Sequence, residues 1–188
     1  MIEIFILSLV QGITEFLPVS SSSHLILISE KLSFENRILS IDVSLHIGSF
    51  FAVLFYFRKD IIDFFENKIL FFKILVSSLP VMIVGYFLVE LNFINKIRNM
   101  ETIAWTTTLF GILLFLSDRL KLEKTINTNL NYKSAIFIGL FQILSLVPGV
   151  SRSGIAITAA RLLKFKRRVP RPIPMKVIII YIDTLLGL

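Results

Sequence analysis

Two stretches of the chain combine polar and charged side chains at a spacing that suits phosphate chemistry. The first, Gln11 to His24 (QGITEFLPVSSSSH), places a carboxylate, four consecutive serines and an imidazole in an apolar N-terminal region. The second, Gln142 to Gly154 (QILSLVPGVSRSG), has its glutamine at the same distance before a Val-Ser pair, and a proline precedes the serines in both. Because burying unpaired polar groups is costly, we predict that the two stretches are halves of one functional site.

Both stretches lead into a predicted helix, whose first turn presents N–H groups and a partial positive charge that suit phosphate. The candidate anion ligands carry hydroxyl groups or are small: Ser20, Ser21, Ser22 and Ser23 in the first stretch, and Ser151, Ser153 and Gly154 in the second. Arg152 lies in the second stretch. A guanidinium between apolar helices needs an anionic partner, and its paired N–H donors match the oxygens of a phosphate. Helix capping is the alternative role for each serine.

Three further polar residues accompany the serines. Glu15 follows Gln11 by four positions, so on a helix both project from one face and could offer oxygens to a hard cation or a water. His24 could act as general acid/base or as nucleophile, or could be structural. Asp42 and His46 form another i, i+4 pair that could support the site. Together these residues predict phosphate-oxygen chemistry on an apolar co-substrate reached from a bilayer.

The composition is that of a membrane protein. Of 188 residues 55% are apolar and 18 are Phe, with a mean hydropathy of +0.80. The net charge of +7 comes from basic residues between apolar runs, which favours contacts with lipid headgroups over nucleic-acid binding. The absence of Cys excludes disulfides and thiolate chemistry. No cleavable signal peptide is predicted, because the first apolar segment lacks a basic start and carries Glu15.

The elements expected to position the site form an all-α integral membrane protein with a single membrane domain over 1–188. Two re-entrant helical hairpins are predicted at 1–33 and 134–163, since their short helices around polar breaks at 17–23 and 147–154 cannot span alone. Transmembrane helices are predicted at 41–57, 71–91 and 103–117. Residues 164–188, basic and rich in proline, are expected to form a divergent tail.

The distribution of Lys and Arg predicts the orientation of this multi-helix bundle. Connections 58–73 and 118–133 carry four basic residues each, and 29–40 and 92–102 carry two each, which places the first pair in the cytoplasm. Three spanning helices between the hairpins then make these enter from opposite faces. Such an inverted repeat brings broken helices together near the membrane midplane.

EFLPVSSSSH, with Gln11 four residues before the Glu, together with PGVSRSG, resembles the bacterial undecaprenyl-diphosphate phosphatase family, also called the bacitracin-resistance (BacA/UppP) family. The resemblance covers about residues 1–165. It implies hydrolysis of undecaprenyl diphosphate to undecaprenyl phosphate and inorganic phosphate, which recycles the lipid carrier for cell-wall synthesis. It also implies a multi-pass enzyme of the bacterial inner membrane that uses a divalent cation, Mg²⁺ or Ca²⁺.

The resemblance also implies roles for the site residues. Expected catalytic residues are Glu15, Ser21, His24 and Arg152; expected phosphate ligands are Ser20, Ser22, Ser151, Ser153 and Gly154; expected metal ligands are Gln11 and Glu15. The nucleophile is either a serine of the first motif or the histidine, and both stay open. We favour Ser21 as nucleophile or water-positioning group and His24 as acid/base. The expected partners are a polyprenyl diphosphate lipid and membrane lipids, with a homodimer left open and nucleic acid excluded.

The sequence departs from the family pattern at two places. Ser23 stands where the family usually has glycine. After about Phe165 the likeness stops, although the family continues through further helices, so the tail predicts a truncated or frameshifted end. Two alternatives to the phosphatase follow: a lipid-phosphate transporter or flippase, because inverted repeats are common in transporters, and an inactive remnant of the phosphatase.

Overall fold

The computed structural model describes residues 2–32, 39–91, 93–97, 99–121, 123–125 and 129–166. Within these ranges the regular structure is helical and no strand forms; an isolated parallel bridge joins Lys124 to Phe165. The predicted all-helical class is therefore confirmed. Most of the predicted tail, residues 167–188, lies outside the described residues.

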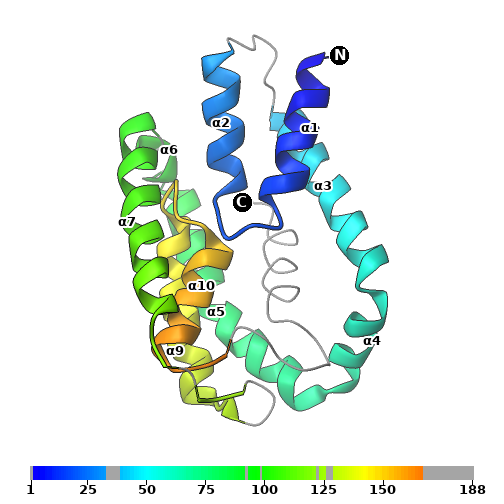
Figure 1. The fold of residues 1–188 in the computed structure, drawn as a ribbon, viewed down its shortest axis with the longest axis vertical. Coiled ribbons are helices and arrows are strands. Elements are labelled where there is room, and N and C mark those ends of the chain that lie inside the picture. Colours follow the sequence, from blue (N-terminus) through cyan, green and yellow to red (C-terminus); the bar gives the residue numbers. More distant parts are fainter. Residues whose placement is uncertain are drawn as a thin grey trace.

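The first polar stretch joins α1 (Ile2–Thr14) to α2 (Ser21–Lys31), which pack side by side with the break at one end (Figure 1). The helix expected from residue 24 begins three residues earlier. The reason is a cap: the side chain of Ser20 accepts a hydrogen bond from the N–H of Ser23 and so satisfies a donor of the first turn. The break therefore runs over 15–20 and not over the predicted 17–23, and Ser21 and Ser23 lie in helix.

Five helices follow between the two polar stretches. They are α3 (Leu39–Tyr56), α4 (Arg58–Glu66), α5 (Lys68–Glu90), α6 (Phe93–Ile97) and α7 (Met100–Asp118). The three long ones lie where transmembrane helices are predicted. Helix α4 falls in a segment that the sequence predicts to be a connection. It forms a helix because Phe64 packs against the buried core and against the ring of Phe71, with 5.6 Å between the ring centroids.

The second polar stretch is built in the same way as the first. Helix α9 (Tyr132–Gln142) continues as a 3-10 turn, η1 (Ile143–Leu146), and after the break α10 (Arg152–Leu162) returns beside it. All of α10 from Ser153 to Arg161 is buried, and the helix packs against both α7 and α9. Its alanines allow close packing, and a Cβ on Gly139 of α9 would overlap the carbonyl of Ser77 on α5.

The outer surface of the described residues is strongly apolar. Helices α5 and α7 are long and apolar enough to cross a membrane, and little of either is buried by the protein. Large apolar side chains are exposed on several helices: Phe5, Phe55, Tyr86 and Trp105 are each at least 63% accessible. Exposure of this apolar surface to water would cost free energy, whereas the lipid of a bilayer would cover it. The fold thus fits a membrane protein.

Candidate functional site

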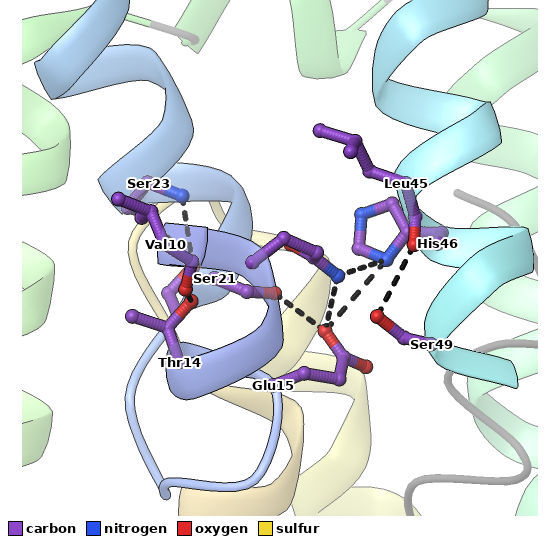
Figure 2. Close-up of polar contacts among 10 residues, drawn as sticks. Val10, Thr14, Glu15, Ser21, Ser23, Leu45, His46 and Ser49 are labelled. Carbon is purple, nitrogen blue, oxygen red and sulfur yellow. Dashed lines mark hydrogen bonds and ion pairs between the residues drawn. The ribbon is translucent and has the colours of Figure 1, made fainter. Parts of the chain in front are cut away.

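The carboxylate of Glu15 is the centre of the first polar stretch. Glu15 directly follows α1, and only 9% of its surface is exposed. Its Oε2 accepts hydrogen bonds from Gln11 Nε2 at 2.8 Å and from Ser21 Oγ at 2.9 Å (Figure 2). Gln11 and Glu15 therefore lie on one face of the end of α1, as their spacing predicts. The break also brings the first hydroxyl of α2 onto the carboxylate.

His46 of α3 completes this cluster. Its Nδ1 lies 2.9 Å from Gln11 Nε2 and 3.7 Å from Glu15 Oε2 (Figure 2). An amide nitrogen only donates, so Nδ1 accepts and the proton of the neutral ring is on Nε2. Gln11 thus donates to both neighbours and links Glu15 to α3. From sequence, His46 is singled out only as a supporting residue, and the structure places it in contact with two predicted metal ligands.

The side-chain oxygen of Gln11 is available to a cation. Gln11 is buried, and its Oε1 has no hydrogen-bond partner within the described part of the chain. Among those residues no three His, Cys, Asp or Glu side chains gather as a metal-binding group. An amide oxygen and one carboxylate still suit a hard cation such as Mg²⁺, which keeps several waters and takes further oxygens from a phosphate ligand. The residues present therefore fit the expected divalent cation.

His24 lies on α2, three residues after Ser21 and so on the same side of the helix. Its Nδ1 is 2.7 Å from the carbonyl oxygen of Ser20. Since a carbonyl only accepts, Nδ1 carries the proton, and Nε2 holds the lone pair of the neutral ring. A fixed tautomer with Nε2 unprotonated is what a general base requires.

The two breaks cap their following helices in the same manner. Ser20 Oγ lies 3.4 Å from the N–H nitrogen of Ser23, and Ser151 Oγ lies 3.2 Å from that of Gly154. In the first turn of each helix a second serine adds a hydroxyl contact, Ser23 Oγ to Ser20 Oγ at 2.8 Å and Ser153 Oγ with Ser151 Oγ at 3.2 Å. Capping is therefore a role that Ser20 and Ser151 have in the structure. Phosphate binding, the other role predicted for them, would use the N–H groups in the first turns of α2 and α10.

The breaks also contact each other. A Cβ added to Gly154 would lie 3.2 Å from the carbonyl oxygen of Pro18, so the start of α10 touches the break before α2. Arg152, half-buried, is the first residue of α10, and Ser22 is exposed on the first turn of α2. The structure thus brings together stretches far apart in the chain, as their matching spacing predicts.

Two threonines of α7 that the sequence reasoning missed hold the second break. Thr106 Oγ1 donates to the carbonyl of Pro148 at 2.6 Å, and Thr107 Oγ1 donates to that of Gly149 at 3.1 Å. A run of three threonines within an apolar helix is the signal that could have drawn attention to them. Their partners, however, depend on how α7 packs against the break.

Comparison with known proteins shows the family of this chain. Residues 4–171 match the family model described as bacitracin resistance protein BacA, and both polar stretches lie inside the match. The chain belongs to the BacA family. A BacA relative from Pelagibacter ubique (strain HTCC1062), named undecaprenyl-diphosphatase, is 51% identical over 167 residues, which cover 88% of this chain and 65% of the relative.

Two further relatives bear the same name, undecaprenyl-diphosphatase. The one from Jannaschia sp. (strain CCS1) is 39% identical over 178 residues, covering 87% of this chain and 66% of the relative. The one from Saccharophagus degradans (strain 2-40 / ATCC 43961 / DSM 17024) is 43% identical over 174 residues, covering 86% and 65%. The chain therefore spans about 65% of the length of these BacA relatives.

Proposed function

We propose that this chain hydrolyses undecaprenyl diphosphate to undecaprenyl phosphate and inorganic phosphate. Membership of the BacA family and the name of the relatives support the substrate. The observation that carries the reaction is the hydrogen bond from Ser21 Oγ to the buried carboxylate of Glu15 at 2.9 Å. A serine bonded to a carboxylate, next to a second break that bears Arg152, is the arrangement of an activated nucleophile beside an anion site.

The Ser21–Glu15 contact favours Ser21 over His24 as the nucleophile. In the proposed first step Ser21 Oγ bonds to the terminal phosphorus, the bridging P–O bond breaks, and the lipid monophosphate leaves. The serine proton passes to Glu15 Oε2. Water then bonds to the phosphorus of the phosphoserine and the P–Oγ bond breaks. His24 Nε2 takes a proton from that water and passes it to solvent, and Ser21 regains its proton from Glu15. Inorganic phosphate is released.

Arg152 and the first turns of α2 and α10 supply the charge that the diphosphate requires. The guanidinium bonds two phosphate oxygens through its fork, and the helix N-termini add N–H donors from the turns that contain Ser22, Ser153 and Gly154. The Ser20 and Ser151 caps hold the two helix N-termini before substrate arrives, so the donors of these turns favour the transition state without reorganising.

A divalent cation, Mg²⁺ or Ca²⁺, belongs to this proposal. Gln11 Oε1 and the carboxylate of Glu15 would hold it, and His46 keeps the Gln11 amide in the required orientation through the contact at Nδ1. When bound, the cation neutralises negative charge on the phosphate oxygens.

The architecture of the proposal is an inverted repeat in the inner membrane. We take α1–α2 and α9–α10 as re-entrant units that enter from opposite faces of a multi-pass protein. Support comes from the shared cap arrangement of the two breaks and from the contact between Gly154 and Pro18. The lipid tail would then lie in the bilayer while its diphosphate reaches the breaks, which suits recycling of the carrier for cell-wall synthesis. A homodimer stays a prediction.

Phosphate release by the purified chain tests the function. The protein in detergent is given undecaprenyl diphosphate with and without Mg²⁺, and Glu15→Ala serves as the control. We expect cation-dependent release from the unmutated chain alone. Release no greater than that of the control would reject catalysis by this chain. A second arm extends the chain with the C-terminal third of the Pelagibacter ubique relative; release only there would assign the activity to the longer protein. Lipid translocation without hydrolysis in both arms would favour a transporter.

A further inference from the structure

Helix α7 carries three consecutive threonines whose hydroxyls have different partners. Thr106 and Thr107 donate across to consecutive backbone carbonyls of the second break, those of Pro148 and Gly149, at 2.6 and 3.1 Å. Thr108 donates to Ala104 of its own helix at 2.8 Å. Two of the three hydroxyls therefore form hydrogen bonds with the backbone of the break.

The hydroxyl of Thr106 has three carbonyl oxygens within hydrogen-bond distance, and two of them belong to its own helix. Its Oγ1 also lies 2.7 Å from the carbonyl of Thr102 and 3.2 Å from that of Ile103. One hydroxyl has a single proton, so these carbonyls and that of Pro148 compete for it. The bond to Pro148 is the shortest of the three. If the bond to Pro148 were lost, the hydroxyl could still donate to a carbonyl of α7. Thr106 therefore does not need the break to satisfy its hydroxyl group.

The backbone of the break is shaped to this contact. Gly149 has φ of +94°, a conformation that favours glycine. A Cβ there would lie 2.8 Å from the carbonyl oxygen of Ile103 and would overlap the hydroxyl of Thr106. The break thus approaches α7 as closely as a residue without a side chain allows.

The orientation of these carbonyls bears on the anion site that follows. Ser151 caps α10 two residues after Gly149, and Arg152 opens the helix. A carbonyl oxygen carries partial negative charge and repels phosphate, whereas the N–H groups of the first turn attract it. Carbonyls that are bonded to α7 point toward that helix, and this orientation fixes where the start of α10 presents its donors.

We propose that Thr106 and Thr107 are positioning residues that hold the second break in the conformation that binds a diphosphate. The inference rests on the proposed function, since it takes the second break as the diphosphate site. The threonines act through Ser151 and Arg152 and do not touch the substrate themselves.

The test compares hydroxyl removal with hydroxyl retention on one helix. The purified chain is titrated with inorganic diphosphate at saturating Mg²⁺ for the unmutated protein, the Thr106→Val/Thr107→Val double variant, the Thr106→Ser/Thr107→Ser double variant and the Thr108→Val control. Thermal unfolding of each protein is followed in the same detergent. If the double valine variant does not accumulate, the two single valine variants take its place.

We expect the valine double variant to bind diphosphate at least about fivefold more weakly, since each lost hydrogen bond is worth roughly a factor of two to ten. The serine variant and Thr108→Val should bind like the unmutated chain. Equal affinity in the valine variant would overturn the proposal, and so would a loss that serine does not restore. Because this readout is binding, it stands apart from the phosphate-release assay that tests the function itself.

Discussion

Gly154 at the start of α10 lies against Pro18 in the break before α2, because a Cβ added to Gly154 would be only 3.2 Å from the Pro18 carbonyl oxygen. This contact joins the first turn of one unit to the break of the other. It links the acidic, serine-rich half of the site to the half that carries Arg152. The proposed reaction depends on it, because the nucleophile and the arginine must meet the same diphosphate.

Gly154→Ala should therefore reduce turnover. The added methyl group is tighter than an ordinary contact against both Pro18 and Ser151 Cβ, at 3.1 Å, so the breaks must separate by a few tenths of an ångström. We expect a loss of about three- to tenfold, since small misplacements of reacting groups are costly. Gly12→Ala on α1 is the matched control, because nothing lies within 4 Å of a Cβ there. Equal phosphate release by both variants would show that the contact does not matter.

His24→Ala should separate chemistry from binding. The ring is held by its Nδ1 bond to the Ser20 carbonyl with Nε2 as the basic nitrogen, so its loss removes a proton acceptor. We expect turnover to fall by about 100-fold or more, with the affinity for inorganic diphosphate unchanged. Glu30→Ala, at an exposed position of the same helix, is the control. An equal loss of affinity and turnover would make His24 a ligand-binding residue, as a transporter would need.

The packing of α10 against α7 should depend on one ion pair. Arg161 donates from Nε and Nη2 to Asp118 Oδ1, at 2.6 Å each, and its side chain is largely buried. Arg161→Met should lower the free energy of unfolding by roughly 2 kcal/mol, or the melting temperature by about 4–8 °C. Arg119→Met is the control, because Arg119 is exposed and stacks on Phe115. Similar melting temperatures for the two variants would show that the Arg161–Asp118 ion pair does not stabilise the fold.

The sequence predicts those features that depend on local spacing. The i, i+4 relation of Gln11 and Glu15 and the all-helical class follow from residues close in the chain, and the pairing of the two breaks follows from the matching spacing inside each of them. The start of α2 at Ser21 is missed, because serines suit both a break and a first helical turn, and the Ser20 cap decides between them.

Contacts that depend on how helices pack are not predictable in this way. The bond of His46 to Gln11 needs α3 beside α1, and the bonds of Thr106 and Thr107 need α7 beside the second break. Nothing in the spacing of these residues specifies such partners. Helix α4 is missed for a related reason: Phe64 gains its burial from the core and from Phe71, so a segment rich in charge still folds as helix.

Turnover of Arg152→Lys tests most directly the claim that both breaks act on one diphosphate. Lysine keeps the charge but loses the planar fork that bonds two phosphate oxygens. Phosphate release from undecaprenyl diphosphate is measured at saturating cation and matched membrane expression. We expect a loss of at least about tenfold in turnover, roughly 1.4 kcal/mol of transition-state stabilisation. Turnover equal to that of the unmutated protein would show that Arg152 is not a phosphate ligand, and the second break would have to be removed from the site.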